Sequence, residues 1–272
     1  MTSRDYRMSG ALIKPVIEAR ESVLVVLPYA LGVSIALVVW YFVSLRFHIT
    51  TFPSPRDTFA EALRLFGSGE ILGEAWISVT RILVGFTLAS AIAVPIGLAM
   101  GVSEFVRRMF EPITEFFRFI PAISMIVFAL IWFGVGEASK VFLVVFNTIF
   151  IVIINTEAGA SAVGRNAVRA AQMMGAAPWQ VFRYVVVPSA VPYVVTGMRI
   201  AMGRSFTTIV AAEMLGASSG LGFMIFSARE FMRMDTVLVG IVLLGLLGLA
   251  IDVAFRLAVR HFGQAYLGNT VT

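Results

Sequence analysis

Long apolar runs separated by short polar segments dominate the chain. Uncharged stretches cover 22–45, 82–103, 119–136, 141–156 and 236–251. A helix needs about 20 mostly apolar residues to cross a hydrocarbon core about 30 Å thick. The pattern therefore predicts membrane-spanning helices, and small residues next to the shorter runs lengthen them.

A further apolar region covers 184–228 and is interrupted by Arg199, Arg204 and Glu213. We interpret 187–217 as one span, and the glycine-rich segment 218–222 as a turn or re-entrant loop. The fold class is then an all-α membrane protein with six transmembrane helices and a transmembrane domain over 22–258. The six spans are expected at about 22–45, 79–103, 112–136, 140–161, 187–217 and 236–258.

The composition supports a membrane protein and argues against an ordinary soluble enzyme. Hydrophobic residues make up 59% of the chain and the mean hydropathy is +0.91, whereas soluble domains contain about 45–50%. The chain has no cysteine, which excludes disulfide staples and cysteine-ligated zinc. Its two histidines lie in separate polar flanks, so we expect neither a metal site nor a catalytic triad.

Basic residues set the expected orientation. The net charge is +5, and Lys and Arg accumulate on the cytoplasmic flanks of spans. We therefore expect contact with membrane lipid and no nucleic-acid partner. Eleven basic residues flank one side of the predicted spans and six flank the other. Both termini are thus predicted to be cytoplasmic, with an N-terminal segment 1–21 and a tail 259–272. The first run has no cleavage site and should remain in the membrane.

Two connections are too long to be simple turns. The outer one, about 47–78, contains Phe59, Leu63 and Phe66 at helical spacing, which predicts a short amphipathic helix that braces the bundle or lies on the outer leaflet. The cytoplasmic one, 162–186, predicts two short helices. Gly175 ends the first, because glycine tolerates the left-handed geometry of a helix C-terminus, and Pro178 suits the first turn of the second.

The cytoplasmic connection has a surface suited to a partner. Ala170 and Ala171 would leave a smooth patch that fits closely into a groove. Helices this short are marginal in water by themselves, so another protein is expected to pack against them.

A specific motif lies in this connection. Arg169-Ala170-Ala171, three residues, Gly175, nine residues, Val185, one residue and Val187-Pro188 resembles the "EAA" loop of permeases in binding-protein-dependent ABC importers. That loop reads Glu-Ala-Ala, three residues, Gly, nine residues, Ile, one residue, Leu-Pro. Arg169 replaces the glutamate, which weakens the expectation of an acidic contact there.

Other segments are similar to the taurine, aliphatic sulfonate and nitrate subfamily of these permeases. They are Val-Thr-Arg-Ile-Leu-Val-Gly-Phe at 79–86, Ile-Trp-Phe-Gly-Val-Gly-Glu at 131–137, Thr-Gly-Met-Arg-Ile at 196–200 and Val-Ala-Ala-Glu-Met-Leu-Gly-Ala at 210–217. The resemblance covers about 78–260. It implies a type I, MetI-like permease fold in a bacterial inner membrane and transport of a small, anionic solute such as taurine, a sulfonate or nitrate.

The resemblance also implies partners. Two copies of the chain would form the pore, two cytoplasmic ATPase subunits would bind the loop, and a periplasmic or lipid-anchored binding protein would deliver solute. No phosphate-binding Gly-x-x-x-x-Gly-Lys-Ser/Thr motif is present, so the chain is expected to be non-catalytic, with ATP and Mg on the partner ATPase. The residues expected to couple to the ATPase are Arg165, Arg169, Ala170, Ala171, Gly175, Ala176 and Trp179.

Charged residues within spans are the candidates for the translocation pathway, because they usually face protein or water. Arg204 lies near the middle of the fifth span, and Thr207, Thr208 and Ala211 follow it on one helical face. We predict that Arg204 attracts an anion. The alternative is that it pairs with a carboxylate such as Glu157 or Asp252.

Three more charged residues are candidates for the pathway. Arg199 and Glu213 belong to the subfamily pattern, which favours a structural or gating role, such as an Arg81–Glu213 pair near the outer surface, over direct solute contact. Arg118 lies at the inner end of the third span, where extending to the interface is the alternative to a pathway role.

Two other function classes remain open from the residues alone. An intramembrane enzyme would need a nucleophile and base or metal ligands within the spans, and no histidine lies there. A secondary transporter would work without an ATPase, but such proteins usually interrupt helices in both halves of an internal repeat. Only one half shows such an interruption here.

Overall fold

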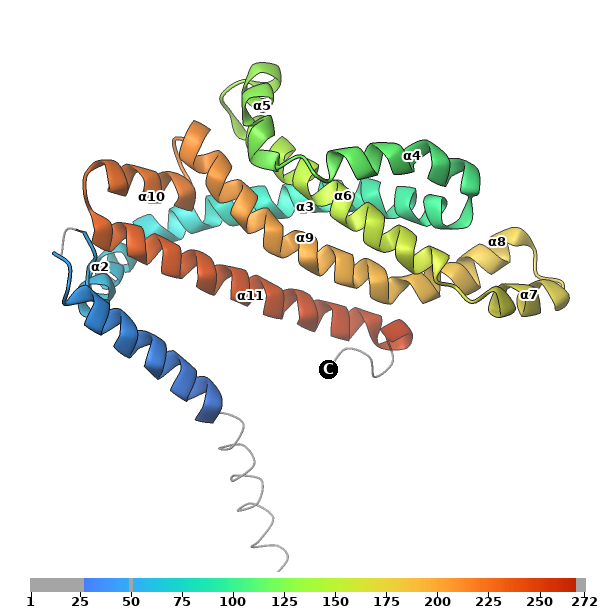
Figure 1. The fold of residues 1–272 in the computed structure, drawn as a ribbon, viewed down its shortest axis with the longest axis horizontal. Helices are drawn as coiled ribbons and strands as arrows, with labels where there is room; N and C mark the ends of the chain where they lie inside the picture. The colour runs from blue at the N-terminus through green and yellow to red at the C-terminus, as the bar shows by residue number, and fades with distance from the viewer. Residues whose placement is uncertain (1–26, 49–50, 268–272) are drawn as a thin grey trace, which may run out of the picture.

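The computed structural model describes residues 27–48 and 51–267, and helices are the only regular elements in those ranges. The predicted segment 1–21 and the last residues of the predicted tail lie outside them. Five helices are long and apolar enough to cross a membrane, and a sixth span results if one bent pair is counted as a single span. The five helices (Figure 1) are Leu27–Ser44, α3 (Glu70–Val102), α6 (Glu137–Ser161), Pro178–Gly216, which contains α9 (Val187–Gly216), and Met234–His261, which lies within α11 (Met234–Leu267).

The core of the bundle consists of α3, α6 and α9 in close contact. A Cβ added at Gly85 or Gly97 of α3 would lie 2.7 Å from Val144 or 2.6 Å from Thr156 of α6. Small residues let helix backbones approach in this way where lipid provides no hydrophobic driving force for association. The three helices therefore form a rigid framework on which the remaining elements are placed.

The third predicted span is not one continuous helix. Instead of a helix over 112–136, α4 (Glu104–Phe117) is followed by a short 3-10 turn (Ala122–Met125) and α5 (Ile126–Phe133), at a bend of 90°. Figure 1 shows α5 rising steeply away from α4. Pro121 lies at the break, where it has no N–H to donate and restricts the residue before it to extended geometry. If this bent pair is counted as one span, the six predicted spans are retained.

The fifth span is longer than predicted. α9 begins at Val187 as expected, but it continues backward through a π-helical turn (Phe182–Val186) into α8 (Pro178–Val181), so that Pro178–Gly216 forms one 39-residue segment. Within the turn, the Val187 N–H donates to the Phe182 carbonyl. Pro188 has no N–H, and a wider π turn accommodates its ring next to the preceding turn. The fifth span and α8 therefore form one continuous helical segment, which changes direction between α9 and α8 (Figure 1).

The predicted amphipathic helix is present as α2 (Pro55–Gly67) and packs on α11. Leu65 and Thr58 of α2 are buried, whereas Phe59, Leu63 and Phe66 are exposed. These three side chains are thus left uncovered for the outer leaflet, one of the two predicted placements. Glycine-bounded α10 (Leu221–Glu230) follows α9 after the turn predicted over 218–222.

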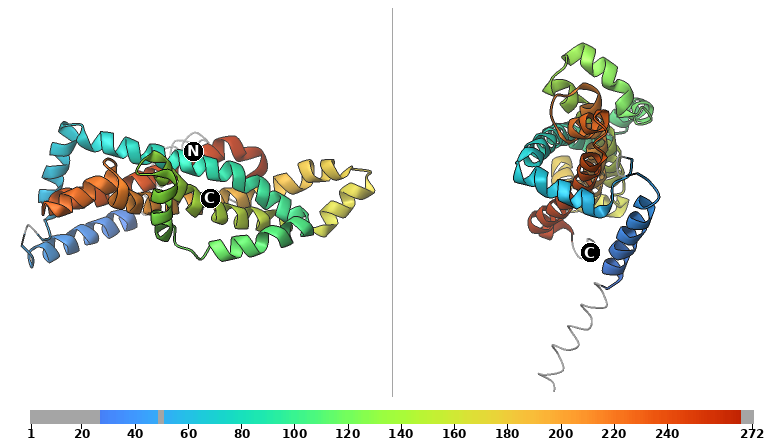
Figure 2. Two further views of the ribbon diagram at one scale, coloured as in Figure 1. Left: turned by 90° about the horizontal axis from the view of Figure 1, so that it is seen from above. Right: turned by 90° about the vertical axis from the view of Figure 1, so that its left-hand side faces the viewer.

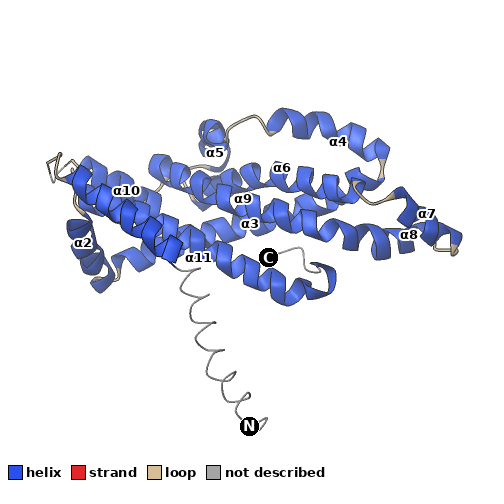
Figure 3. Ribbon diagram, turned by 60° about the horizontal axis from the view of Figure 1, so that its bottom comes forward, coloured by secondary structure: helices blue, strands red, loops and turns tan. Residues whose placement is uncertain are grey.

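The remaining elements define the two ends of the molecule. Views from two further directions show Leu27–Ser44 diverging from the bundle, with α2 and α10 at one end (Figure 2, Figure 3). The hairpin of α7 (Arg165–Met173) and α8 projects from the opposite end.

Candidate functional site

The α7–α8 hairpin forms a compact knob. Gly175 has a φ of +83° and ends α7, with its N–H donating to the Gln172 carbonyl at 2.9 Å. Pro178 occupies the first turn of α8, and the Gln180 side chain accepts from the Ala177 N–H at 2.7 Å. The left-handed residue forces the reversal, and the proline starts the next helix in a preset geometry. The helix stop at Gly175 and the start at Pro178 are as predicted.

The knob presents long apolar side chains rather than an alanine patch. Ala171 is buried beneath the hairpin together with Val181, so the expectation that Ala170 and Ala171 both face a partner was wrong for Ala171. A helix of nine residues turns one face inward, and the small Ala171 side chain lies on that face. The outward positions include Arg169, Ala170 and Gly175, while Ala176 is half-buried. Arg165 begins α7.

Three knob residues have large, mostly solvent-exposed side chains. Met173, Met174 and Trp179 are 88%, 82% and 67% exposed. Flexible methionines and tryptophan are enriched in protein contact surfaces. The sequence analysis did not single out Met173 and Met174, although their position immediately before Gly175 could have indicated that they lie at the exposed tip.

A second feature is a cavity of about 400 Å³ halfway along α9. Its walls come from α6, from α9 and from the break between α4 and α5, and its lining residues are Pro121, Ala122, Ile123, Asn147, Arg204, Thr207, Thr208 and Ala211. The structure thus brings together the four α9 residues that the sequence placed on one face. It adds Asn147 and the segment around Pro121, which sequence reasoning did not assign to this site.

The carboxylates considered as partners of Arg204 are occupied elsewhere. Asp252 on α11 accepts from Arg199 at 2.6 Å and lies 3.2 Å from Arg256, and Glu157 accepts from the Ser161 hydroxyl at 2.9 Å. Among the described residues, Arg204 forms no ion pair. Its guanidinium therefore remains available to the cavity.

The other charged candidates do not line this cavity. Arg199 lines a separate groove between α9 and α11. Arg118 is exposed, pairs with Glu115 at 2.7 Å and lies 4.4 Å from the centre of the Phe119 ring, as expected for a residue at an interface. Glu213 has no exposed surface. Of the three, none shares a site with Arg204 in this structure.

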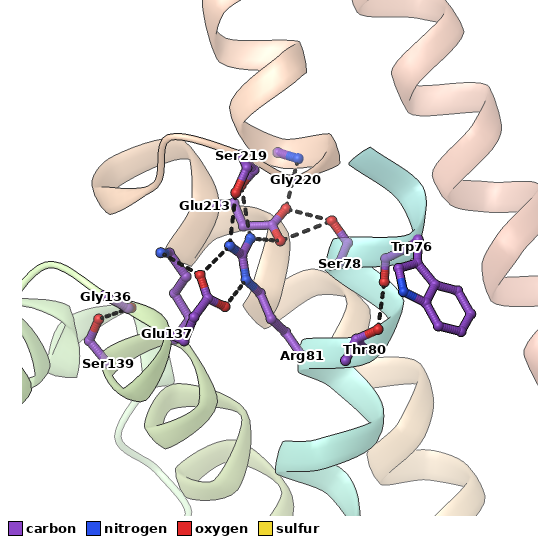
Figure 4. Close-up of polar contacts among 12 residues, drawn as sticks. Trp76, Ser78, Thr80, Arg81, Gly136, Glu137, Ser139, Glu213, Ser219 and Gly220 are labelled. Atoms are coloured by element: carbon purple, nitrogen blue, oxygen red, sulfur yellow. Dashed lines mark hydrogen bonds and ion pairs between the residues drawn. The ribbon is translucent and has the colours of Figure 1, made fainter. Parts of the chain in front are cut away.

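Glu213 instead belongs to a buried ionic network at the opposite end from the knob (Figure 4). The predicted Arg81–Glu213 pair is present, with Arg81 Nη1 donating to Glu213 at 2.7 Å. Glu213 also accepts from the Ser78 hydroxyl and from the Gly222 N–H, each at 2.9 Å. Every oxygen of the buried carboxylate thus has donors, which buried charges require.

Arg81 connects two more parts of the fold. Its Nε and Nη2 donate to Glu137 at the start of α6, at 2.5 and 2.6 Å, and its Nη1 donates to the Ser219 carbonyl at 2.8 Å. One guanidinium thereby joins α3, α6 and the turn between α9 and α10. Sequence reasoning did not assign Glu137 as a partner of Arg81, although Glu137 ends the motif at 131–137.

Comparison with known proteins identifies the family of the chain that carries the knob and the cavity. Residues 91–264 match the family described as the inner membrane component of binding-protein-dependent transport systems. The chain belongs to this family. It is therefore a multi-pass inner-membrane permease component, in agreement with its long apolar helices.

Curated relatives come from the predicted subfamily. The chain is 34% identical over 235 residues to the taurine transport system permease protein TauC of Escherichia coli strain K12, covering 84% of this chain and 86% of TauC. It is 31% identical over 232 residues to the nitrate import permease protein NrtB of Synechocystis, covering 82% and 84%.

A solved structure has the same fold. The MetNI methionine ABC transporter, in an inward-facing conformation, matches with a TM-score of 0.62 and 22% identity over 70% of this chain and 94% of the matched chain. The type I, MetI-like permease fold expected from the resemblance is therefore confirmed.

Proposed function

We propose that this permease moves a small anion, such as taurine, another sulfonate or nitrate, into the cell in a complex with two ATPase subunits. Two copies would form the pore and a separate binding protein would deliver the solute. Both termini and the knob would then face the cytoplasm, as the distribution of Lys and Arg indicates. The names of TauC and NrtB support this solute class.

The continuity of Pro178–Gly216 is the observation that carries the mechanism. Trp179, near the start of this helical segment, and Arg204, in the cavity wall, are 25 residues apart. This corresponds to about 37 Å along the helix at 1.5 Å per residue. A displacement of the knob by an ATPase would therefore shift the cavity wall with it. The knob residues named above, led by Trp179, are proposed to seat in the ATPase.

The chain itself would contribute no chemistry. ATP and Mg²⁺ would bind the partner ATPase, whose closure would supply the displacement. The permease residues hold the solute pathway and transmit the movement, so the binding of nucleotide and the binding of solute occur on different chains. Arg204, with Thr207 and Thr208, is proposed to line the pathway. Arg199, Glu213 and Arg118 are proposed to support the fold around it.

Paired tryptophan variants test the coupling surface. Trp179 on the knob and Trp76 at the opposite end of the molecule are exposed to similar extents, 67% and 73%. Trp179→Ala is expected to reduce co-purification of the ATPase with the permease and to reduce ATP-dependent uptake, whereas Trp76→Ala leaves the complex assembled. Equal co-purification from both variants would refute the knob as the ATPase contact.

A further inference from the structure

One residue that lines the cavity beside Arg204 carries a buried hydrogen-bond donor with no acceptor. The Asn147 Nδ2 atom is buried and has no hydrogen-bond partner among the described residues. The Thr208 hydroxyl is used, because it donates to the Arg204 carbonyl at 3.2 Å. Within the part of the chain that the structure describes, no Asp or Glu lines the cavity. Buried donors are rarely left unpaired, because the lost hydration is not recovered, so the cavity is suited to an acceptor-rich guest.

A hydrogen bond between α6 and α9 lies next to Asn147 and Arg204. The Thr148 and Ser205 hydroxyls are 3.0 Å apart, and neither residue has exposed surface. This contact pins α6 to α9. Asn147 and Arg204 each precede one of the two pinned residues, and both line the cavity. Both residues therefore lie at one level of the cavity wall, on helices rather than on loops.

The third wall of the cavity is the break in the third span. Pro121, Ala122 and Ile123 line it at the point where α4 ends and the chain bends. Non-helical backbone at membrane depth is tolerated where it lines a cavity, and interrupted helices commonly form transporter solute sites. The break therefore places non-helical backbone in the wall of the cavity.

We propose that Asn147 and Arg204 form a two-donor subsite for the oxyanion group of the transported solute. The subsite deepens the proposed function and rests on it. Sulfonate and nitrate offer several acceptor oxygens and one negative charge, which matches a guanidinium and an amide N–H₂ with no competing carboxylate. Asn147 would be the specificity-determining partner of Arg204, and a cationic group would be excluded from this position.

The charge preference can be measured without transport. The chain has no cysteine, so Asn147→Cys introduces one thiol into each copy of the permease. In the assembled complex, we compare its reaction with methanethiosulfonate reagents that carry a sulfonate or a trimethylammonium group, each normalised to its rate with free mercaptoethanol. The sulfonate reagent is expected to react faster by about tenfold or more, because a positive cavity concentrates anions. Adding Arg204→Gln should remove this preference.

Three outcomes of the labelling would overturn the subsite. They are equal normalised rates for the two reagents, a preference for the cationic reagent, and a preference that Arg204→Gln leaves unchanged. A thiol that neither reagent reaches, with or without ATP, would also contradict it, because solute could not reach that position either.

Uptake into proteoliposomes tests the amide itself. Asn147→Leu keeps the side-chain size but removes the donor, and should lower the maximal rate of sulfonate or nitrate uptake by about five- to tenfold. The half-saturating concentration should not change, since the binding protein captures the solute. Asn147→Gln should restore most of the rate. The matched control is Asn155→Leu on the same helix, because the Asn155 amide donates to the Ile151 carbonyl at 2.8 Å.

The two assays separate the inference from the proposed function. If Asn147→Leu and Asn155→Leu transport equally well, the subsite is refuted while the permease function stands. If the unmodified complex accumulates no anion with ATP, the proposed function is refuted, and the labelling rates still decide whether the cavity selects anions.

Discussion

Removing Arg81 should destabilise the permease more than the loss of any surface ion pair. Arg81 is 4% exposed and Glu213 has no exposed surface. Arg81→Ala leaves the Glu213 carboxylate buried with only the Ser78 and Gly222 donors. It also removes the Arg81 contacts to Glu137 and to the Ser219 carbonyl, so the turn between α9 and α10 is held to α3 only through Glu74 and Ser78.

The burial of the Arg81–Glu213 pair sets the expected loss of stability. Breaking a buried ion pair by removing one partner costs about 3–5 kcal/mol. At roughly 2–4 °C per kcal/mol for a chain of this size, the thermal midpoint should fall by about 6–20 °C. Arg118→Ala is the control, because Arg118 and Glu115 form an exposed pair, and such pairs contribute about 0.2–1 kcal/mol.

Thermal unfolding of the two variants in the same detergent is the assay. Arg81→Lys keeps the positive charge but cannot reproduce the forked contacts, so its midpoint should lie between those of the wild type and Arg81→Ala. If Arg81→Ala unfolds within a degree or two of Arg118→Ala, the network does not hold this end of the bundle together, and the reasoning is refuted.

Further predictions follow from single positions. Gly175→Val forces a branched side chain to φ +83°, at a cost of about 1–3 kcal/mol, and should weaken ATPase co-purification. Gly85→Leu places a Cβ 2.7 Å from Val144 and should separate α3 from α6, which folded yield measures. The pKa of Glu61 is lowered to about 2, mainly by hydrogen bonding to Arg64. Because its folded pKa lies below the unfolded value of 4.5, Glu61 stabilises α2 above pH 4.5 and loses this effect as the pH falls towards 2. Between pH 4.5 and pH 2, the thermal unfolding midpoint should fall less for Glu61→Gln than for the wild type.

The sequence predicted features that depend on local chemistry. Gly175 and Pro178 have backbone requirements of their own, so the end of α7 and the start of α8 could be placed without a structure. Apolar length likewise located the long helices. The Arg81–Glu213 pair was found because both residues belong to the motifs of the resemblance.

The sequence did not predict features that depend on tertiary packing. The uncharged stretch 119–136 contains the bend within the third span, and hydropathy does not distinguish a broken helix from a straight one. The burial of Ala171 depends on how α7 lies against α8. Asn147 lies within an apolar run, and only the contact between α6 and α9 shows that it faces the same cavity as Arg204.

ATP-driven transport through this permease is tested most directly by reconstitution with and without the ATPase. Proteoliposomes would contain the permease and binding protein, with ATP supplied on the side that the knob faces, and accumulation of radiolabelled taurine or nitrate would be measured. We predict accumulation only when the ATPase and hydrolysable ATP are both present. Accumulation by the permease alone, driven by an ion gradient, would contradict the account and indicate a secondary transporter.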